Sequence, residues 1–174
     1  MKKALMYAAA LAFVGGSMAT TSFAQETKPL GLSVRLGMFW PNMDQAKKAG
    51  KTWFAGGVEY KLGDLKYASE GSNMSASYSI SADYYQKNDF RHVPILVNFI
   101  GRTDTIYYFA GAGIGMTREK DKLGNRKNYT GFGYQVGVGY EIAKSQAPIF
   151  VEAKYVGNSR SEVNGFGVFV GIRF

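Results

Sequence analysis

The C-terminal segment from Asn164 to Phe174 constrains the fold most, because its side chains alternate with a period of two. Counted back from the last residue, every second side chain is apolar, giving the set Phe174, Ile172, Val170, Val168 and Phe166. The residues between them are mostly glycine or charged. Successive side chains of a β-strand point to opposite faces. The segment is therefore predicted to be a strand with one apolar face.

The N-terminal segment has the character of an export signal. Lys2 and Lys3 precede an apolar run from Ala4 to Val14, and Ser22-Phe-Ala24 places small residues at the two positions that matter for cleavage. Residues 1–24 are predicted to be a cleaved signal peptide, which leaves one domain over residues 25–174. The chain has no cysteine, so disulfides, thiolate metal sites and lipid attachment to cysteine are excluded.

Seven further segments show the same alternation over roughly the 9–11 residues that a tilted membrane-crossing strand needs. No segment after the leader approaches the about 18 apolar residues of a membrane-crossing helix. With the C-terminal segment, the predicted strands are 32–40, 53–62, 75–85, 93–100, 106–116, 130–142, 149–156 and 164–174.

The alternation fits either a soluble β-sandwich or a barrel, and the non-apolar faces decide between them. These faces carry many glycines. Examples are Gly111, Gly113 and Gly115 in the predicted strand 106–116, and Gly137 and Gly139 in the following strand 130–142. Glycine suits the crowded inside of a small barrel better than the solvent face of a sandwich. Lipid also tolerates no unpaired sheet edge. The sequence therefore predicts an all-β fold, an eight-stranded antiparallel up-and-down transmembrane β-barrel.

The connections alternate in length and polarity. Four connections are polar and are predicted to face outside the cell, namely 41–52, 86–92, 117–129 and 157–163. Two connections are short and are predicted to face the periplasm, namely 101–105 and 143–148. The connection 63–74 is longer than the other inner ones. The third strand could therefore begin earlier, near Leu65.

Two strands carry a family resemblance, together with the leader and the eight-strand pattern. Val93-Pro-Ile-Leu-Val-Asn-Phe99 and Tyr108-Phe-Ala-Gly-Ala-Gly-Ile-Gly115 resemble segments of the small outer-membrane β-barrel proteins of the opacity, OmpA-like and OmpW-like group. The resemblance covers nearly the whole mature chain and implies a location in the outer membrane of a Gram-negative-type cell. In proteins of this group, an alternating apolar set that ends in a terminal Phe is similar to the signal read by the barrel-assembly machinery. The resemblance therefore implies this role for the set that ends at Phe174.

The resemblance implies a function only in broad terms. The leading expectation is a structural or surface-interaction role in the cell envelope, without catalytic activity. The alternative is a small OmpW-like channel for apolar or small solutes. A lipid A-modifying barrel enzyme is the third possibility.

The predicted inward faces carry balanced charges. The set comprises Arg35, Lys61, Lys154 and Arg173 with Glu59, Asp83, Glu141 and Glu152. Charges removed from water need partners, so an internal ion-pair network is expected. An ion or proton path is the functional alternative, and it is disfavoured because six aromatic side chains share this interior. These are Phe39, Trp53, Tyr85, Phe109, Phe150 and Phe169.

Catalytic, metal and nucleotide sites find little support. His92 is the only histidine of the sequence, and the residue two positions beyond it is Pro94 and not a serine that could act with it. His92 is expected to be a solvated loop residue. The glycines of 111–115 lie within an alternating strand and lack the strand-to-helix setting of a dinucleotide site. No enzyme activity and no cofactor are expected, and a single histidine without cysteine offers no metal site.

Basic side chains gather in two predicted outer connections. Arg118, Lys120, Lys122, Arg126 and Lys127 lie in 117–129, and three more lysines lie in 41–52. Without Lys2 and Lys3 of the leader, 19 of the 21 basic side chains remain against 13 acidic ones. A solvated loop explains these charges, and so does pairing with the phosphates of lipopolysaccharide. Outer-membrane lipid and the assembly machinery are the expected partners of a monomer, and nucleic acid is not.

Overall fold

Eight strands and one short helix make up the part of the chain that the computed structural model describes, which is residues 31–65, 74–120, 125–142, 147–159 and 163–174. The strands are β1 (Leu32–Pro41), β2 (Trp53–Leu65), β3 (Met74–Lys87), β4 (Phe90–Thr103), β5 (Ile106–Lys120), β6 (Arg126–Glu141), β7 (Ile149–Asn158) and β8 (Gly165–Arg173). The helix α2 (Asp44–Ala49) connects β1 to β2. The predicted leader, 1–24, lies outside the described residues. In the described part, no helix has the length and apolar character to cross a membrane.

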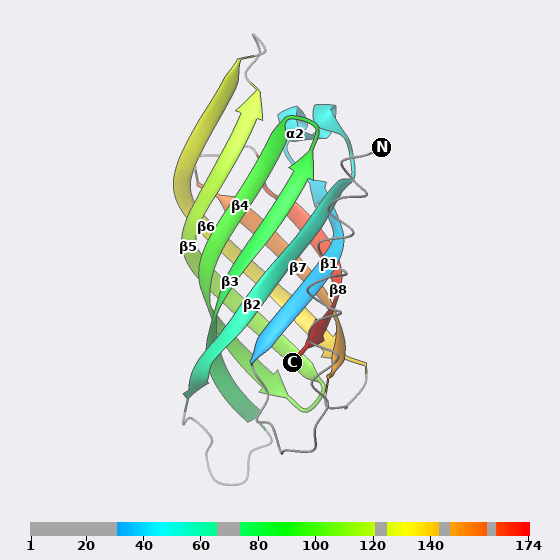
Figure 1. Ribbon diagram of the computed structural model, residues 1–174, viewed down its shortest axis with the longest axis vertical. Coiled ribbons are helices and arrows are strands. Elements are labelled where there is room, and N and C mark those ends of the chain that lie inside the picture. Colours follow the sequence, from blue (N-terminus) through cyan, green and yellow to red (C-terminus); the bar gives the residue numbers. More distant parts are fainter. Residues whose placement is uncertain (1–30, 66–73, 121–124, 143–146, 160–162) are drawn as a thin grey trace, which may run out of the picture.

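Each strand pairs antiparallel with its neighbours in the chain, and β1 pairs with β8 to close the barrel (Figure 1). The closing register runs from Ser33 opposite Arg173 to Pro41 opposite Gly165. We call the end that carries α2 the upper end and the end at which β8 stops the lower end, as they appear in Figure 1. The fold class predicted from the sequence is confirmed.

Several strands are longer than the apolar alternation indicated. The largest difference is at β5 and β6, whose pairing continues to Lys120 opposite Arg126. This part was predicted to be a loop because it is polar, but the ladder of backbone hydrogen bonds does not require apolar side chains. The hairpin rises above the neighbouring strands in Figure 1. β2 likewise extends to Leu65, whereas β3 begins only at Met74.

Two connections shrink to two-residue turns. Asn88 and Asp89 join β3 to β4, and Asp104 and Thr105 join β4 to β5. Asn88 has φ = 52° and Asp104 has φ = 53°. Asn and Asp tolerate this left-handed conformation better than most residues do, and it suits the tight turn of a hairpin. The predicted connection 86–92 was therefore too long.

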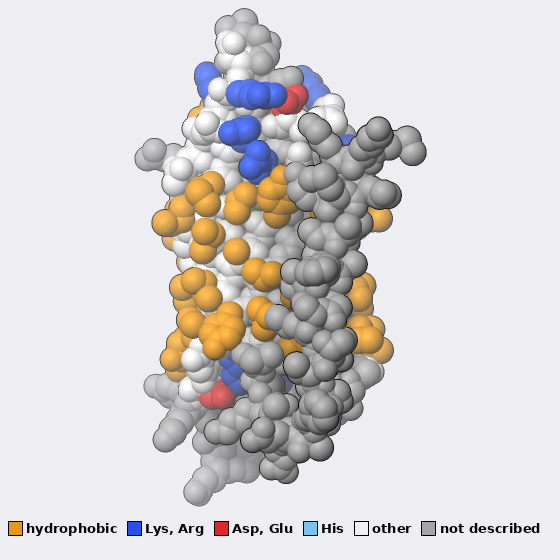
Figure 2. Space-filling model, in the orientation of Figure 1, with side chains coloured by type: hydrophobic (Ala, Val, Ile, Leu, Met, Phe, Trp, Pro, Cys, Tyr) orange, Lys and Arg blue, Asp and Glu red, His pale blue; other side chains and the backbone are white. Residues whose placement is uncertain are grey.

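Side chains alternate between a buried interior and an apolar outer surface. Phe39, Trp53, Tyr85, Phe109, Phe150 and Phe169 are all buried, as expected for inward positions. The outward positions expose large apolar side chains on every strand. On the face drawn in Figure 2 they form a band across the middle of the molecule, with charged side chains above and below it.

Two aromatic clusters close the interior. The upper cluster comprises Phe39, Ala46, Trp53, Ala55, Tyr85, Phe90, Val156, Val163 and Phe169. Ala46 belongs to α2, so the helix packs on this cluster and covers the upper end. The lower cluster comprises Ile100, Tyr107, Phe109 and Phe150.

Inward glycines on β6 make room for these rings. A β-carbon at Gly137 would lie 2.5 Å from Cζ of Phe109 and 2.7 Å from Cβ of Lys154. A β-carbon at Gly139 would collide with the ring of Tyr107. The glycine-rich faces predicted for a crowded barrel interior therefore lie directly against the side chains that fill it.

Candidate functional site

The centre of the interior is organised around Arg35, an inward residue of β1. Its Nε lies 2.9 Å from Asp83 Oδ1, and its Nη2 lies 3.1 Å from Asp83 Oδ2, which makes the pair bidentate. Its Nη1 lies 3.3 Å from Glu59 Oε2 and 3.5 Å from Glu152 Oε2. One buried guanidinium thus contacts carboxylates from β2, β3 and β7, an arrangement that the planar, five-donor group suits.

Lys154 supplies the second buried cation. Its Nζ lies 2.6 Å from Asp83 Oδ2 and 3.5 Å from Glu152 Oε1, and it lies over the ring of Phe169 at 4.6 Å from the centroid. We call Arg35, Glu59, Asp83, Glu152 and Lys154 the central charge network. Mutual attraction and hydrogen bonds offset the cost of desolvating these groups, and the contacts tie four strands together.

Glu141 and Arg173 form a separate group at the lower end. Glu141 Oε1 pairs with both Arg173 Nη1 and Arg102 Nη1. Both guanidinium groups lie over the ring of Tyr107. The distance from Cζ to the ring centroid is 5.2 Å for Arg102 and 5.5 Å for Arg173. The Tyr107 hydroxyl donates to Glu152 Oε2 at 3.2 Å, so this ring separates the lower group from the central charge network. Arg102 was missed because it follows the apolar part of its strand.

Lys61 does not belong to the interior, and the prediction for it is wrong. Its side chain is 44% exposed, and its Nζ lies 2.6 Å from Asp64 Oδ1. Lys61 pairs with Ser79 and has an inward register. However, β1 begins at Leu32, opposite Tyr60, so Lys61 lies at the open lower mouth, where water reaches it.

His92 is also not where it was expected. It is fully buried rather than solvated, because β4 begins at Phe90 and the inward register includes position 92. Its Nδ1 lies 2.7 Å from Thr117 Oγ1. Next to Thr117, Asn158 Nδ2 of β7 donates across the interior to the Gly115 carbonyl oxygen of β5 at 2.6 Å.

A third polar group fills the remaining interior between the aromatic clusters. Asn98 Nδ2 donates to Ser79 Oγ at 3.1 Å and to Ser81 Oγ at 3.0 Å. Gln135 Nε2 donates to Asn98 Oδ1 at 2.6 Å. Together with the charged and aromatic groups, these hydrogen-bonded side chains are buried inside the barrel, as expected for a barrel of eight strands.

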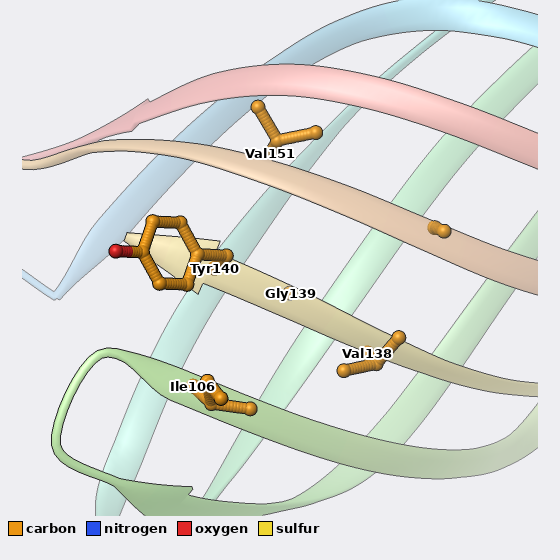
Figure 3. Close-up of a pocket in the computed structure, with 6 residues that line it drawn as sticks. Ile106, Val138, Gly139, Tyr140 and Val151 are labelled. Atoms are coloured by element: carbon orange, nitrogen blue, oxygen red, sulfur yellow. The ribbon is translucent and has the colours of Figure 1, made fainter. Parts of the chain in front are cut away.

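The outer surface carries an apolar depression with a volume of about 300 Å³ on β5, β6 and β7 (Figure 3). Its lining residues are Ile106, Val138, Gly139, Tyr140, Val151 and Ala153. In Figure 3 the labelled side chains lie on the strand surfaces around a shallow hollow. Because Ile106, Val138 and Tyr140 are outward residues, the depression opens to the surroundings of the barrel and not to the lumen.

The predicted C-terminal signal residues lie on β8 and directly after it. Phe166, Val168 and Val170 are outward and exposed, Ile172 and Phe174 are half-buried, and Phe174 follows the last strand residue. Val168 and Ile172 pair with Met38 and Val34 of β1. The apolar set thus forms one continuous outward row beside the closing seam, and its proposed role in assembly stays a prediction.

Four of the five predicted lipopolysaccharide contacts are described, and they lie on β5 and β6 at the upper end. Arg118 is half-buried on β5, Arg126 and Lys127 are exposed on β6, and Lys120 is the last residue of β5. Lys122 lies outside the described residues. Arg126 is paired with Asp89, with 3.1 Å between Nη2 and Oδ1.

One further arginine joins this surface. Arg91 of β4 is exposed and pairs in register with Arg118. We call Arg91 and Arg118 the rim pair. Arg91 lies over the ring of Tyr84 at 5.9 Å, and Arg118 Nε donates to Asn128 Oδ1 at 3.1 Å. Sequence reasoning missed Arg91, although its outward register follows from the alternation of β4.

Charge is distributed unequally between the two ends of the described barrel. The described upper end has nine basic residues, Lys47, Lys48, Lys51, Lys87, Arg91, Arg118, Lys120, Arg126 and Lys127, against the three acidic residues Asp44, Asp89 and Glu119. The lower end has three of each sign, Lys61, Arg102 and Arg173 with Asp64, Asp104 and Glu141. On the face drawn in Figure 2, lysine and arginine side chains gather directly above the apolar band.

Comparisons with known proteins find similarity in structure only. No protein-family model matches the chain, and no curated protein sequence matches it significantly. Among solved structures, the N-terminal β-barrel domain of Pseudomonas aeruginosa OprF is similar with 10% identity and a TM-score of 0.49, covering 84% of this chain and 98% of that one. The outer membrane enzyme PagL has 12% identity and a TM-score of 0.49, with 82% and 98% covered.

Neisserial surface protein A (NspA) has 16% identity and a TM-score of 0.49, covering 84% of this chain and 98% of that one. Identities this low transfer no residue roles. A function for this chain has to follow from its own surface and interior.

Proposed function

We propose that this protein spans the outer membrane of a Gram-negative-type cell as a sealed β-barrel with a structural or surface-interaction role and no catalytic activity. The observation that carries the proposal is the apolar band that surrounds a closed strand wall with a filled interior. A soluble protein would bury such a surface. Lipid accepts it, because the barrel satisfies its backbone hydrogen bonds internally.

The dimensions of the apolar band support this placement. The outward apolar run on β6 and just after it extends from Phe132 to Ile142. At about 3.3 Å per residue and a strand tilt of about 40°, it spans roughly 25 Å, the height of a membrane-barrel surface. Exposed aromatic residues occur near both edges of the band, as they do at membrane interfaces. Trp40, Phe54 and Phe166 lie towards the upper edge, and Tyr60, Tyr108 and Tyr140 towards the lower edge.

The unequal charge of the two ends supports one orientation. An outer membrane presents polyanionic lipopolysaccharide to the outside, and basic side chains bind its phosphates as charge-assisted pairs. The upper end, with its excess of basic residues, therefore faces outside, and the lower end with balanced charge faces the periplasm. The proposed partners are outer-membrane lipids, including lipopolysaccharide, and the barrel-assembly machinery during biogenesis. A closed barrel has no unpaired strand edge, which favours a monomer.

A membrane-impermeant maleimide tests the orientation, because the chain has no native cysteine. Lys48→Cys places a thiol at the exposed upper end, and Asp64→Cys places one at the exposed lower end. We expect Lys48→Cys to react in intact cells and Asp64→Cys only after the outer membrane is opened. Labelling of both variants only in lysed cells, or recovery of the protein in the soluble periplasmic fraction, would reject the proposal.

Conductance separates a sealed barrel from the channel alternative. Hydrogen-bonded, charged and aromatic side chains fill the lumen, and α2 covers its upper end. Purified protein in planar bilayers should therefore show no steady, large conductance. Stable open events approaching about a nanosiemens, well above those of a filled small barrel, would favour the channel instead.

A lipid-modifying enzyme has weaker support. Its catalytic base would have to reach a lipid at the outer surface. The single histidine, His92, is buried inside and lies 2.7 Å from Thr117. Mass spectra of lipid A from cells with and without the protein test this alternative, and we expect identical spectra.

A further inference from the structure

We propose that the rim pair, Arg91 and Arg118, binds a phosphate group of an outer-leaflet glycolipid whose acyl chains lie on the apolar surface directly below. This inference rests on the proposed membrane location with the upper end outward. It goes beyond that location by naming two residues, one ligand group and the surface that receives the rest of the ligand.

The placement of two arginines opposite each other is the first observation. Arg91 and Arg118 are direct partners across β4 and β5, and both point outward. Like charges directly opposite on one sheet face destabilise the sheet. Among the described carboxylates, none forms an ion pair with either guanidinium. An anion between them would convert this repulsion into two attractive, charge-assisted contacts.

The orientation of both guanidinium groups is the second observation. Arg91 lies over the Tyr84 ring, and Arg118 is held by Asn128 through Nε. The Nη groups of Arg118 do not take part in that contact. Since two side chains are held in place before a ligand arrives, less conformational entropy is lost on binding.

The surface below the rim pair is the third observation. In the next outward positions β4 has Val93 and β5 has Met116, which are register partners. Below them lie Ile95 and Ile114, again partners and both exposed. A molecule with a phosphate head and apolar chains, aligned along β4 and β5, matches this sequence of surfaces from the upper end downward.

The neighbouring cations are less suitable for this role. Arg126 forms an ion pair with Asp89, and Lys47 forms one with Asp44, with 3.9 Å between Nζ and Oδ1. The rim pair therefore combines adjacent guanidinium groups with an apolar surface directly beneath. A free phosphate ion would satisfy the guanidinium groups but not the apolar surface, which is why we assign the ligand to a lipid.

Lipid binding by the folded full-length barrel tests the inference. Native mass spectrometry in detergent micelles would follow titrations with bis-phosphorylated lipid A, with the dephosphorylated lipid and with inorganic phosphate. The variants are Arg91→Gln, Arg118→Gln, the double variant, and Arg91→Lys/Arg118→Lys. The matched control is Lys48→Gln/Lys51→Gln, which removes two exposed charges from the same end.

We expect each single Gln variant to bind bis-phosphorylated lipid A about tenfold more weakly. If both arginines hold one phosphate, the double variant should lose less than the product of the two single effects, because the sites are coupled. The Lys variant should recover only part of the affinity, since ammonium groups do not form bidentate contacts. The control should stay within about twofold of the parent protein, a change typical of exposed charges.

Three results would overturn the inference. They are an equal loss in the control, equal binding of the dephosphorylated lipid, and binding of inorganic phosphate as tight as that of the lipid. Failure of the proposed function is distinguishable from these results. A protein that does not run faster in unboiled than in boiled SDS gels is not a folded membrane barrel, whereas a barrel that folds and lacks the lipid preference rejects the rim pair alone.

Discussion

Arg35 and Arg91 are both arginines on strands of the same barrel, but their surroundings are opposite. Arg35 is buried and contacts three carboxylates of the central charge network. Arg91 is exposed and faces a second arginine, Arg118. A buried charge has to be neutralised by the fold itself. A charge on the rim can be left to water or to a ligand, so the two regions should respond differently to loss of an arginine.

Loss of the central guanidinium should have the largest effect. Arg35→Met leaves Asp83 and Glu152 with Lys154 as an ion-pair partner, and it removes the ion pair that Glu59 forms with Arg35. Breaking a buried ion pair from one side typically costs about 3–5 kcal/mol. The free energy of unfolding, measured in urea with protein folded into lipid vesicles, should fall by about that amount. A loss below about 1 kcal/mol, the usual value for an exposed pair, would mean that water enters the lumen and screens these charges.

Loss of a cation at the lower end should have an intermediate effect. Arg102→Gln removes one of the two guanidinium groups on Glu141 and leaves Arg173 in place. The Arg102 side chain is 26% exposed, so solvent screens part of the interaction. We expect a loss of about 1 kcal/mol in the same urea experiment. A loss as large as that of Arg35→Met would show that the lower group is as dry as the central charge network.

Loss of a rim arginine should have the smallest effect on stability, with the opposite sign. Arg91→Gln relieves the repulsion from Arg118, so in neutral lipid the free energy of unfolding should stay unchanged or rise by up to about 0.5 kcal/mol. The matched comparison is Gln86→Ala, which changes an exposed neutral neighbour on the same outward row. A clear loss of stability on Arg91→Gln in neutral lipid would show that Arg91 serves the fold and is not kept for a ligand.

The alternation of side chains was sufficient to predict the strands and the faces on which their residues lie. Arg35, Asp83, Glu152 and Lys154 were assigned to the interior from this pattern, and all four are buried. The pattern was insufficient where strands extend beyond their apolar segments. Arg91, His92 and Arg102 lie in such extensions of β4, so the sequence indicated neither the burial of His92 nor the contacts of the two arginines.

The sequence by itself determined the period of two, the inward glycines and the sign of the charges on each face, because these depend only on neighbours along one strand. The tertiary structure decided which charges meet. Arg35 and Glu152 are 117 positions apart, and they come together only because closure brings β7 near β1 across the lumen. Lys61 has the inward register of its neighbours but lies past the start of β1, so it remains in water. The stagger of paired strands sets how deep each inward residue lies within the barrel. This depth decides whether a charged side chain is buried in an ion pair or remains in water.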